Sequence, residues 1–126
     1  MIATAATPRQ ALDQAMGEAD WQRTVVDLAR TLGWLALHVA DSRKEVMNHR
    51  TRERRLVGDR DAAGLPDWLL IRDRVLFVEL KRQDGQLSAR QCEVLDALDE
   101  AGAEWFVWRP ADYHQAVQVL SERVGR

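Results

Sequence analysis

Two apolar segments separated by three charged residues restrict the fold of this chain more than any other feature. They read "WLLI" at 68–71 and "VLFVELK" at 75–81, with "RDR" between them. Apolar residues occupy both alternating faces of each segment, which is typical of strands inside a sheet that is covered on both sides. A connection this short predicts an antiparallel hairpin. We therefore expect this pair of strands in the interior of a β-sheet.

The segments around the hairpin predict alternating helices and strands. Apolar residues at Trp21, Val25, Leu28 and Leu32 recur at helical spacing, and Gly33 follows as a stop signal. A capping box, Ser88-Ala89-Arg90-Gln91, opens a second helix. The predicted fold class is α/β, a central mixed β-sheet flanked by helices in the order α-β-β-β-α-β-α. The helices are expected at 18–32, 88–101 and 111–124, and the remaining strands at 34–40 and 104–108.

The length of 126 residues suits one domain. We divide the chain into an N-terminal extension at 1–17 and a domain at 18–126. In the extension, Thr7-Pro8-Arg9-Gln10 has the form of a capping box and predicts a short helix. The polar segment 41–63 is predicted to be a long loop inserted in the domain, since it has few apolar residues.

Charge is distributed unevenly along the chain. The net charge is −2 and the isoelectric point is near 5.9, which is not the overall signature of a nucleic-acid-binding protein. Between Ser42 and Arg60, however, seven basic residues face three acidic ones, so this stretch carries +4 and the remainder −6. The stretch is either a solvated loop or a surface that binds DNA phosphates without sequence preference. The candidate DNA-binding residues are Arg43, Lys44, Arg50, Arg52, Arg54 and Arg55.

Several classes of protein are disfavoured by what the sequence lacks. No run of about 18 uncharged apolar residues predicts a transmembrane helix. The first twenty residues lack the basic start and apolar block of a secretory signal. Cys92 is the only cysteine, which excludes an internal disulfide and fits a reducing cytoplasm.

The candidate chemistry lies at one end of the predicted hairpin. Glu79 and Lys81 share one face of their strand, because side chains alternate along a strand. A three-residue loop, 72–74, would place Asp67 opposite Glu79 on that face. A two-residue loop would place Asp67 opposite Leu80, on the wrong face. We predict the three-residue loop or a bulge.

Two carboxylates and an amine in this arrangement suit phosphate chemistry. Mg²⁺ is held by one or two carboxylates together with the phosphate oxygens of a substrate, and Asp67 and Glu79 supply that number. Lys81 would orient an attacking water and stabilise charge on the phosphate. The alternatives are a plain Glu79–Lys81 ion pair and, for Asp67, a polar residue that ends a turn after Pro66.

At these positions the chain resembles the VRR-NUC family of the PD-(D/E)xK nuclease superfamily, and specifically its small virus-type stand-alone members. The resemblance covers roughly residues 18–120. The segment 41–60 departs from it, since it is longer and richer in arginine than the connection expected in the family. The matching residues are Gly64, Pro66-Asp67, Glu79-Leu80-Lys81 and Gln91, with Glu18, Gln22, Gly33-Trp34 and His38 before them.

The resemblance implies a restriction-endonuclease-like core and a role for each matching site residue. Asp67, Glu79 and the Leu80 carbonyl would bind Mg²⁺ or Mn²⁺, Lys81 would assist the nucleophile, and Glu18 would approach the metal directly or through water. Gln91 would support the site from the helix behind. Position N3 of the capping box also explains Gln91, and the helix dipole also explains Glu18.

The function implied is that of a metal-dependent DNA endonuclease, selective for branched DNA such as a Holliday junction. The resemblance also implies a homodimer in the cytoplasm of a bacterial or phage-infected cell. One alternative is a DNA-binding or assembly module whose nuclease site is idle. Another is a metal-independent RNA endonuclease that uses His38 as the base, although His38 is also explained as a packed strand residue. The tryptophans are expected in the core, with Trp68 able to stack on an unpaired base if it is exposed.

Overall fold

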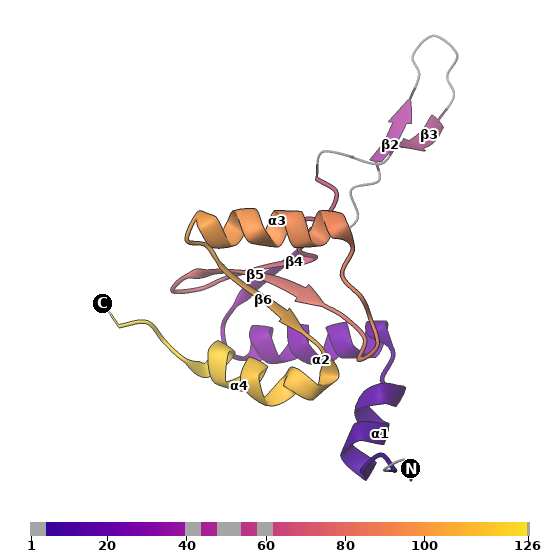
Figure 1. The fold of residues 1–126 in the computed structure, drawn as a ribbon. Coiled ribbons are helices and arrows are strands. Elements are labelled where there is room, and N and C mark those ends of the chain that lie inside the picture. Colours follow the sequence, from indigo (N-terminus) through magenta and orange to yellow (C-terminus); the bar gives the residue numbers. More distant parts are fainter. Residues whose placement is uncertain (1–4, 40–43, 48–53, 58–61, 126) are drawn as a thin grey trace.

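The protein is an α/β domain with a four-stranded mixed sheet flanked by helices (Figure 1). The computed structural model describes residues 5–39, 44–47, 54–57 and 62–125. The sheet has the strand order β1-β4-β5-β6, in which β6 is parallel to β5 and the other neighbours are antiparallel. Its strands are β1 (Leu35–His38), β4 (Trp68–Ile71), β5 (Val75–Leu80) and β6 (Glu104–Trp108).

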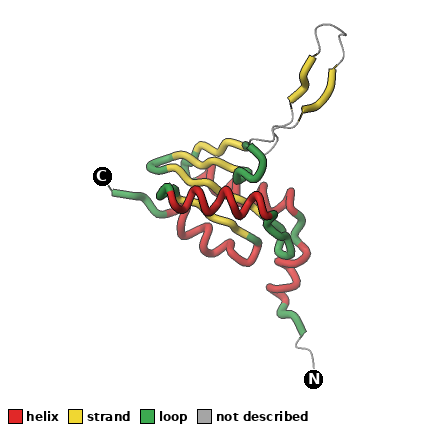
Figure 2. The backbone as a smooth tube through the Cα atoms, turned by 45° about the horizontal axis from the view of Figure 1, so that its top comes forward, coloured by secondary structure: helices red, strands yellow, loops and turns green. Residues whose placement is uncertain are grey.

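Helices lie on both sides of this sheet (Figures 1 and 2). Helix α2 (Glu18–Thr31) and helix α4 (Tyr113–Ser121) cover one face, and α3 (Ala89–Glu100) lies across the other. The short helix α1 (Pro8–Ala15) precedes α2 and has no buried residue. Within the described part of the chain, no helix is long and apolar enough to cross a membrane.

The main core lies between the sheet and the α2–α4 layer. The β5 residues Leu76, Val78 and Leu80 are fully buried there. The indole N–H of Trp21 donates to the Trp108 carbonyl at 2.9 Å, and that of Trp34 donates to the Leu120 carbonyl at 2.9 Å. These three tryptophans are buried, as predicted, whereas Trp68 and Trp105 are only half-buried. The two hydrogen bonds attach α2 to β6 and the start of β1 to the end of α4.

Both predicted capping boxes are confirmed. The Thr7 hydroxyl accepts from the Gln10 amide, and the Gln10 side chain accepts from the Thr7 amide, so α1 begins at Pro8. Ser88 and Gln91 make the same pair of bonds at the start of α3. Each box satisfies backbone N–H groups that have no partner within the helix.

The prediction that 41–63 is a loop without strands was wrong. Strands β2 (Lys44–Met47) and β3 (Arg54–Val57) form a separate antiparallel ladder, with Lys44 paired to Val57. A long polar segment still has backbone groups that require partners, and a ladder supplies them without any hydrophobic periodicity in the sequence. The side chains of all six candidate DNA-binding residues lie outside what the structure describes.

The final helix is shorter than predicted. A 3₁₀ turn, Pro110–Asp112, precedes α4, and α4 ends at Ser121 rather than near 124. The chain beyond it is held extended, because Arg72 donates to the Glu122 carbonyl at 2.7 Å and Asp73 accepts from the Val124 amide at 2.6 Å. Contacts with residues about 50 positions away therefore end this helix.

Candidate functional site

The β4–β5 hairpin has the three-residue turn that the site requires. Ile71 pairs with Val75, so the turn is 72–74, and Trp68 pairs with Val78 at the other end. One step further along the same register, Asp67 lies opposite Glu79. The predicted three-residue turn is confirmed. This turn places both acidic residues on the face of the sheet that carries α3.

Glu79 is the centre of a small polar cluster. Its side chain is only 3% exposed. One carboxylate oxygen accepts from the Asp67 backbone N–H at 3.0 Å, and the other accepts from Gln91 Nε2 at 3.2 Å. Lys81 Nζ lies 3.6 Å from that second oxygen. A buried carboxylate is thus held by two hydrogen bonds and one ion pair from three places in the chain.

The environment raises the pKa of both acidic side chains. Burial and, next to it, the charge of Asp67 raise the pKa of Glu79 to about 7, against the lowering effect of the Asp67 N–H and of Lys81. Burial also raises the pKa of Asp67, with the charge of Glu18 acting in the same direction and His38 and Lys81 opposing it. Burial is the main reason that the charged form of both groups is disfavoured, and a cation bound between these carboxylates would offset that cost.

Gln91 caps its helix and also contacts Glu79. Its Oε1 accepts from the Ser88 amide at 2.8 Å and completes the capping box, while its Nε2 donates to Glu79. Because the backbone N–H requires an acceptor, the box fixes the orientation of the side-chain amide and turns its NH₂ toward Glu79. The start of α3 thereby positions a carboxylate on β5.

The turn before Asp67 depends on Gly64. Its φ is +86°, and a Cβ at this position would lie 2.7 Å from Arg90 Cγ and 2.8 Å from the Arg90 carbonyl oxygen. Arg90 Nε also donates to the Ala63 carbonyl at 3.0 Å. Sequence reasoning missed Arg90, since nothing in its local pattern indicates that it contacts a turn 27 residues earlier.

Two of the predicted site residues lie at the margin of the cluster. Glu18 is exposed at the first position of α2, close enough for its charge to act on Asp67. His38 ends β1 and stacks on Trp68, with ring centroids 4.5 Å apart. The interpretation of His38 as a packed residue is wrong in part, because its ring has this partner but stays exposed at the end of the edge strand.

The donor set fits a hard divalent cation that also binds its substrate. Asp67 and Glu79 provide two carboxylates, and Leu80, whose carbonyl is the third predicted ligand, lies between Glu79 and Lys81 at the end of β5. Among the described residues, no three His, Cys, Asp or Glu side chains form a metal-binding group. Such a site suits Mg²⁺ or Mn²⁺, which retain water and phosphate oxygens as ligands, better than Zn²⁺.

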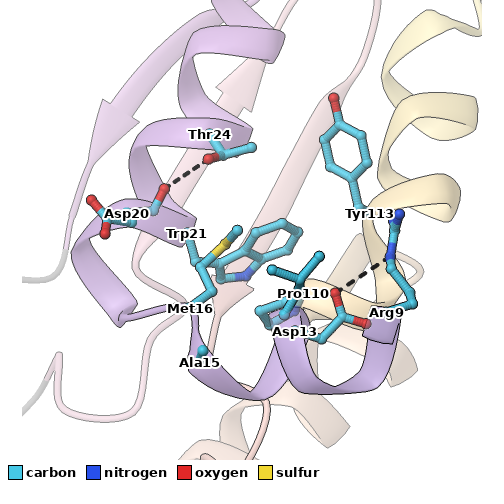
Figure 3. Close-up of a pocket in the computed structure, with 10 residues that line it drawn as sticks. Arg9, Asp13, Ala15, Met16, Asp20, Trp21, Thr24, Pro110 and Tyr113 are labelled. Carbon is cyan, nitrogen blue, oxygen red and sulfur yellow. Dashed lines mark hydrogen bonds and ion pairs between the residues drawn. The ribbon is translucent and has the colours of Figure 1, made fainter. Parts of the chain in front are cut away.

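A groove between the helices lies away from this cluster. It has a volume of about 470 Å³ and lies between α1, α2 and the start of α4 (Figure 3). Met16, Trp21 and Tyr113 supply much of its lining, and the Arg9–Asp13 ion pair borders it. None of its lining residues belongs to the carboxylate cluster at the end of the sheet.

Comparison of the chain with protein-family models, with curated proteins and with solved structures found no match. Its function must therefore be inferred from the side chains and their arrangement.

Proposed function

We propose that this protein is a Mg²⁺- or Mn²⁺-dependent DNA endonuclease with a restriction-endonuclease-like core. The observation that carries the proposal is the convergence of Asp67 and Glu79 across the hairpin, beside Lys81. A plain ion pair would pair one acid with one base. Here a second acidic group lies next to the pair, and the pKa of both acids is raised. Acidic side chains with raised pKa values beside another charged group are found more often at binding and catalytic sites than at purely structural positions.

Each residue has a role that follows from its position. Asp67, Glu79 and the Leu80 carbonyl would hold the cation, with Glu18 approaching from α2 through water. When bound, the cation supplies Lewis acidity to the phosphate and lowers the pKa of a water ligand. Lys81 holds positive charge 3.6 Å from Glu79, where it can orient the attacking water and stabilise charge that develops on phosphate oxygens. Gln91 keeps the Glu79 carboxylate in place.

The substrate proposed is branched DNA, of the Holliday-junction type. The arginine-rich stretch would follow the sugar–phosphate backbone without reading sequence, through Arg43, Lys44, Arg50, Arg52, Arg54 and Arg55. A domain of this size has little surface for a four-way junction, and a homodimer would present two sites to matched strands. Binding that weakens steeply between low and moderate salt would support phosphate contacts.

The test is cleavage of linear, flap and four-way substrates with Mg²⁺ or Mn²⁺. Glu79→Ala and Lys81→Ala should each reduce cleavage by about a hundredfold or more, because each removes a group that contacts the reacting centre. The matched control is the Arg82–Asp84 ion pair, which has the same two-residue spacing but is about half exposed. Arg82→Ala and Asp84→Ala should leave cleavage within about twofold.

The outcomes separate the proposal from its alternatives. If neither Glu79→Ala nor Lys81→Ala changes cleavage, or if no substrate is cut with either metal, the enzyme proposal is wrong. DNA binding that survives in that case indicates an assembly module. Full activity in EDTA that is lost in His38→Ala indicates a metal-independent nuclease instead.

Metal binding can be tested without cleavage. Mn²⁺ should raise the thermal midpoint of the wild-type protein, since a ligand of the folded state stabilises it. The effect should be small without DNA, because only two carboxylates are present, and it should vanish in Asp67→Asn. An equal effect of Mn²⁺ on Asp67→Asn would place the metal elsewhere.

A further inference from the structure

The α3 face of the sheet carries exposed apolar side chains on β1 and at the start of β5, beside the β4–β5 turn. Three of the five exposed large apolar side chains in the described residues lie there: Leu35 at 57%, Leu37 at 42% and Val75 at 44%. Leu35 and Val75 belong to one row across the sheet, through Ile71, and Leu37 begins the next row. A group of aligned apolar residues on one face marks an interaction surface more often than scattered ones do.

Strand β1 is also an open edge. Among the described residues it pairs only with β4. The Val39 N–H donates to the Asp67 carbonyl, so residues alternating with Val39, which are Leu35 and Leu37, direct their backbone groups toward β4. Ala36 and His38 therefore direct theirs outward. The strand carries no lysine, proline or bulge, the features that protect other edges from pairing.

Helix α2 borders this edge with charges of alternating sign. Arg23, Asp27 and Arg30 are exposed and spaced by four and three residues, so they lie on one stripe of the helix. The guanidinium of Arg30 reaches the outward-facing Ala36 carbonyl at a long 3.5 Å. This contact places the stripe beside the open edge of β1.

From this arrangement we infer that a second copy of the chain pairs with β1 in an antiparallel, two-fold dimer. With Leu37 on the two-fold axis, Ala36 and His38 exchange backbone hydrogen bonds with His38 and Ala36 of the second copy. The exposed leucines then lie on one continuous face, because an antiparallel two-fold keeps the faces of the sheet together. The two four-stranded sheets become one.

The charges on α2 favour the register with Leu37 on the axis over the register with Ala36 on the axis. Two strand residues advance about 6.6 Å, which equals roughly four residues of helix. With Leu37 on the axis, Arg30 therefore faces the Asp27 of the second copy, and Asp27 faces its Arg30. With Ala36 on the axis, the two Arg30 side chains would meet and repel. The exposed apolar surface is small, so we expect a reversible dimer that depends on concentration and salt.

The test is sedimentation velocity over a range of protein concentrations. Leu37→Lys places a charge on the axis and should weaken dimerisation by about tenfold or more. Leu12→Lys is the matched control, since Leu12 is 68% exposed on α1 and far along the chain from β1. It should leave the dimer unchanged.

A charge swap tests the register. Asp27→Arg and Arg30→Asp should each weaken the dimer, because every single reversal creates two like-charge pairs across the axis. The double variant Asp27→Arg/Arg30→Asp should recover most of the affinity, and circular dichroism should show all variants folded. A wild-type protein that stays monomeric at every concentration overturns the proposal, as does a dimer that Leu37→Lys leaves intact.

This proposal does not depend on the nuclease chemistry. Glu79→Ala should abolish cleavage without changing dimerisation, whereas Leu37→Lys should give a monomer that still binds Mn²⁺. Failure of either proposal is therefore visible without the other.

Discussion

The two ends of the β4–β5 hairpin hold charge in opposite ways. At the turn, Asp73 accepts from Arg72 Nε at 2.6 Å and from the Val124 amide, and these bonds hold its pKa well below the usual range. At the open end, burial and a second carboxylate raise the pKa of Glu79 to about 7. The same pair of strands thus carries one acidic group whose charge is fully compensated and another whose charge is not.

This difference separates charge that builds the fold from charge that is available for chemistry. Arg72 donates to the carbonyls of Leu32 and Leu120, at 3.0 and 3.1 Å, and lies 4.4 Å over the Trp34 ring. The charges at the turn are therefore compensated by contacts within the fold. At the open end, Lys81 does not offset the burial of the Glu79 carboxylate, and a bound divalent cation would do so.

The largest effect is expected from breaking the compensated end. Arg72→Ala removes a nearly buried side chain and leaves three carbonyls and one Asp73 oxygen without their donor, so we expect a loss of roughly 3 kcal/mol of unfolding free energy. Urea denaturation measures it. Arg82→Ala removes an exposed arginine and should cost less than about 0.5 kcal/mol. Equal effects of the two variants would mean that Arg72 does not hold the C-terminal segment.

The second prediction uses pH to sharpen the comparison. Folded Glu79 keeps its proton up to about pH 7, whereas the unfolded chain releases it near 4.5, so the folded state binds more protons between these values. Stability should therefore fall as pH rises through this window, by on the order of 2 kcal/mol, and level off above it. Thermal or urea unfolding without metal measures this, and Glu79→Gln should flatten the curve.

Asp73 provides the control with the opposite sign. Its folded pKa lies below the unfolded value of 3.8, so the stability it contributes is present above that pH and is lost as the solution becomes more acidic. Asp73→Asn should flatten only the acidic limb. A wild-type curve that rises between pH 5 and 7 would contradict the raised pKa of Glu79.

The third prediction concerns the turn that delivers Asp67. Gly64→Ala should cost about 2 kcal/mol, because it combines a positive φ with a close approach to the Arg90 backbone. Gly102→Ala is the matched control, since Gly102 also has a positive φ, +78°, but a Cβ there meets nothing within 4 Å. It should cost about 1 kcal/mol. Only Gly64→Ala should also weaken Mn²⁺ binding.

The smallest effect is expected at Gln91. Gln91→Glu keeps the acceptor of the capping box but replaces the donor beside Glu79 with a third negative charge. Stability at pH 8 should fall by about 1 kcal/mol, and the pH window of Glu79 should move upward. Gln10→Glu makes the same change in the α1 box, which has no such partner, and should be nearly neutral. Identical responses at the two positions would show that Gln91 only caps its helix.

The sequence predicted what is decided by neighbouring residues. Side chains alternate along each strand, so Asp67 and Glu79 could share a face only with a three-residue turn or a bulge between the strands. The capping boxes were predictable because a side chain and a backbone group three residues apart determine them. The roles proposed for these residues in catalysis are not determined in this way and stay predictions.

What the sequence missed depends on residues distant in the chain. The end of α4 follows from Arg72 and Asp73, which no local pattern near Ser121 indicates. The exposure of His38 and Leu37 depends on how far the helices extend over β1. The ladder of β2 and β3 arises from backbone pairing within a segment whose side-chain pattern favoured a loop.

The Gln91 side chain joins the first turn of α3 to the Glu79 carboxylate. The formation of this helix turn and the orientation of the carboxylate are therefore coupled. The Ser88 amide hydrogen, which is bound to the same side chain, becomes a spectroscopic reporter of the state of a group 9 residues earlier in the chain. Its exchange with solvent would follow protonation or ligand binding at the end of the sheet, in a signal that is separate from catalysis.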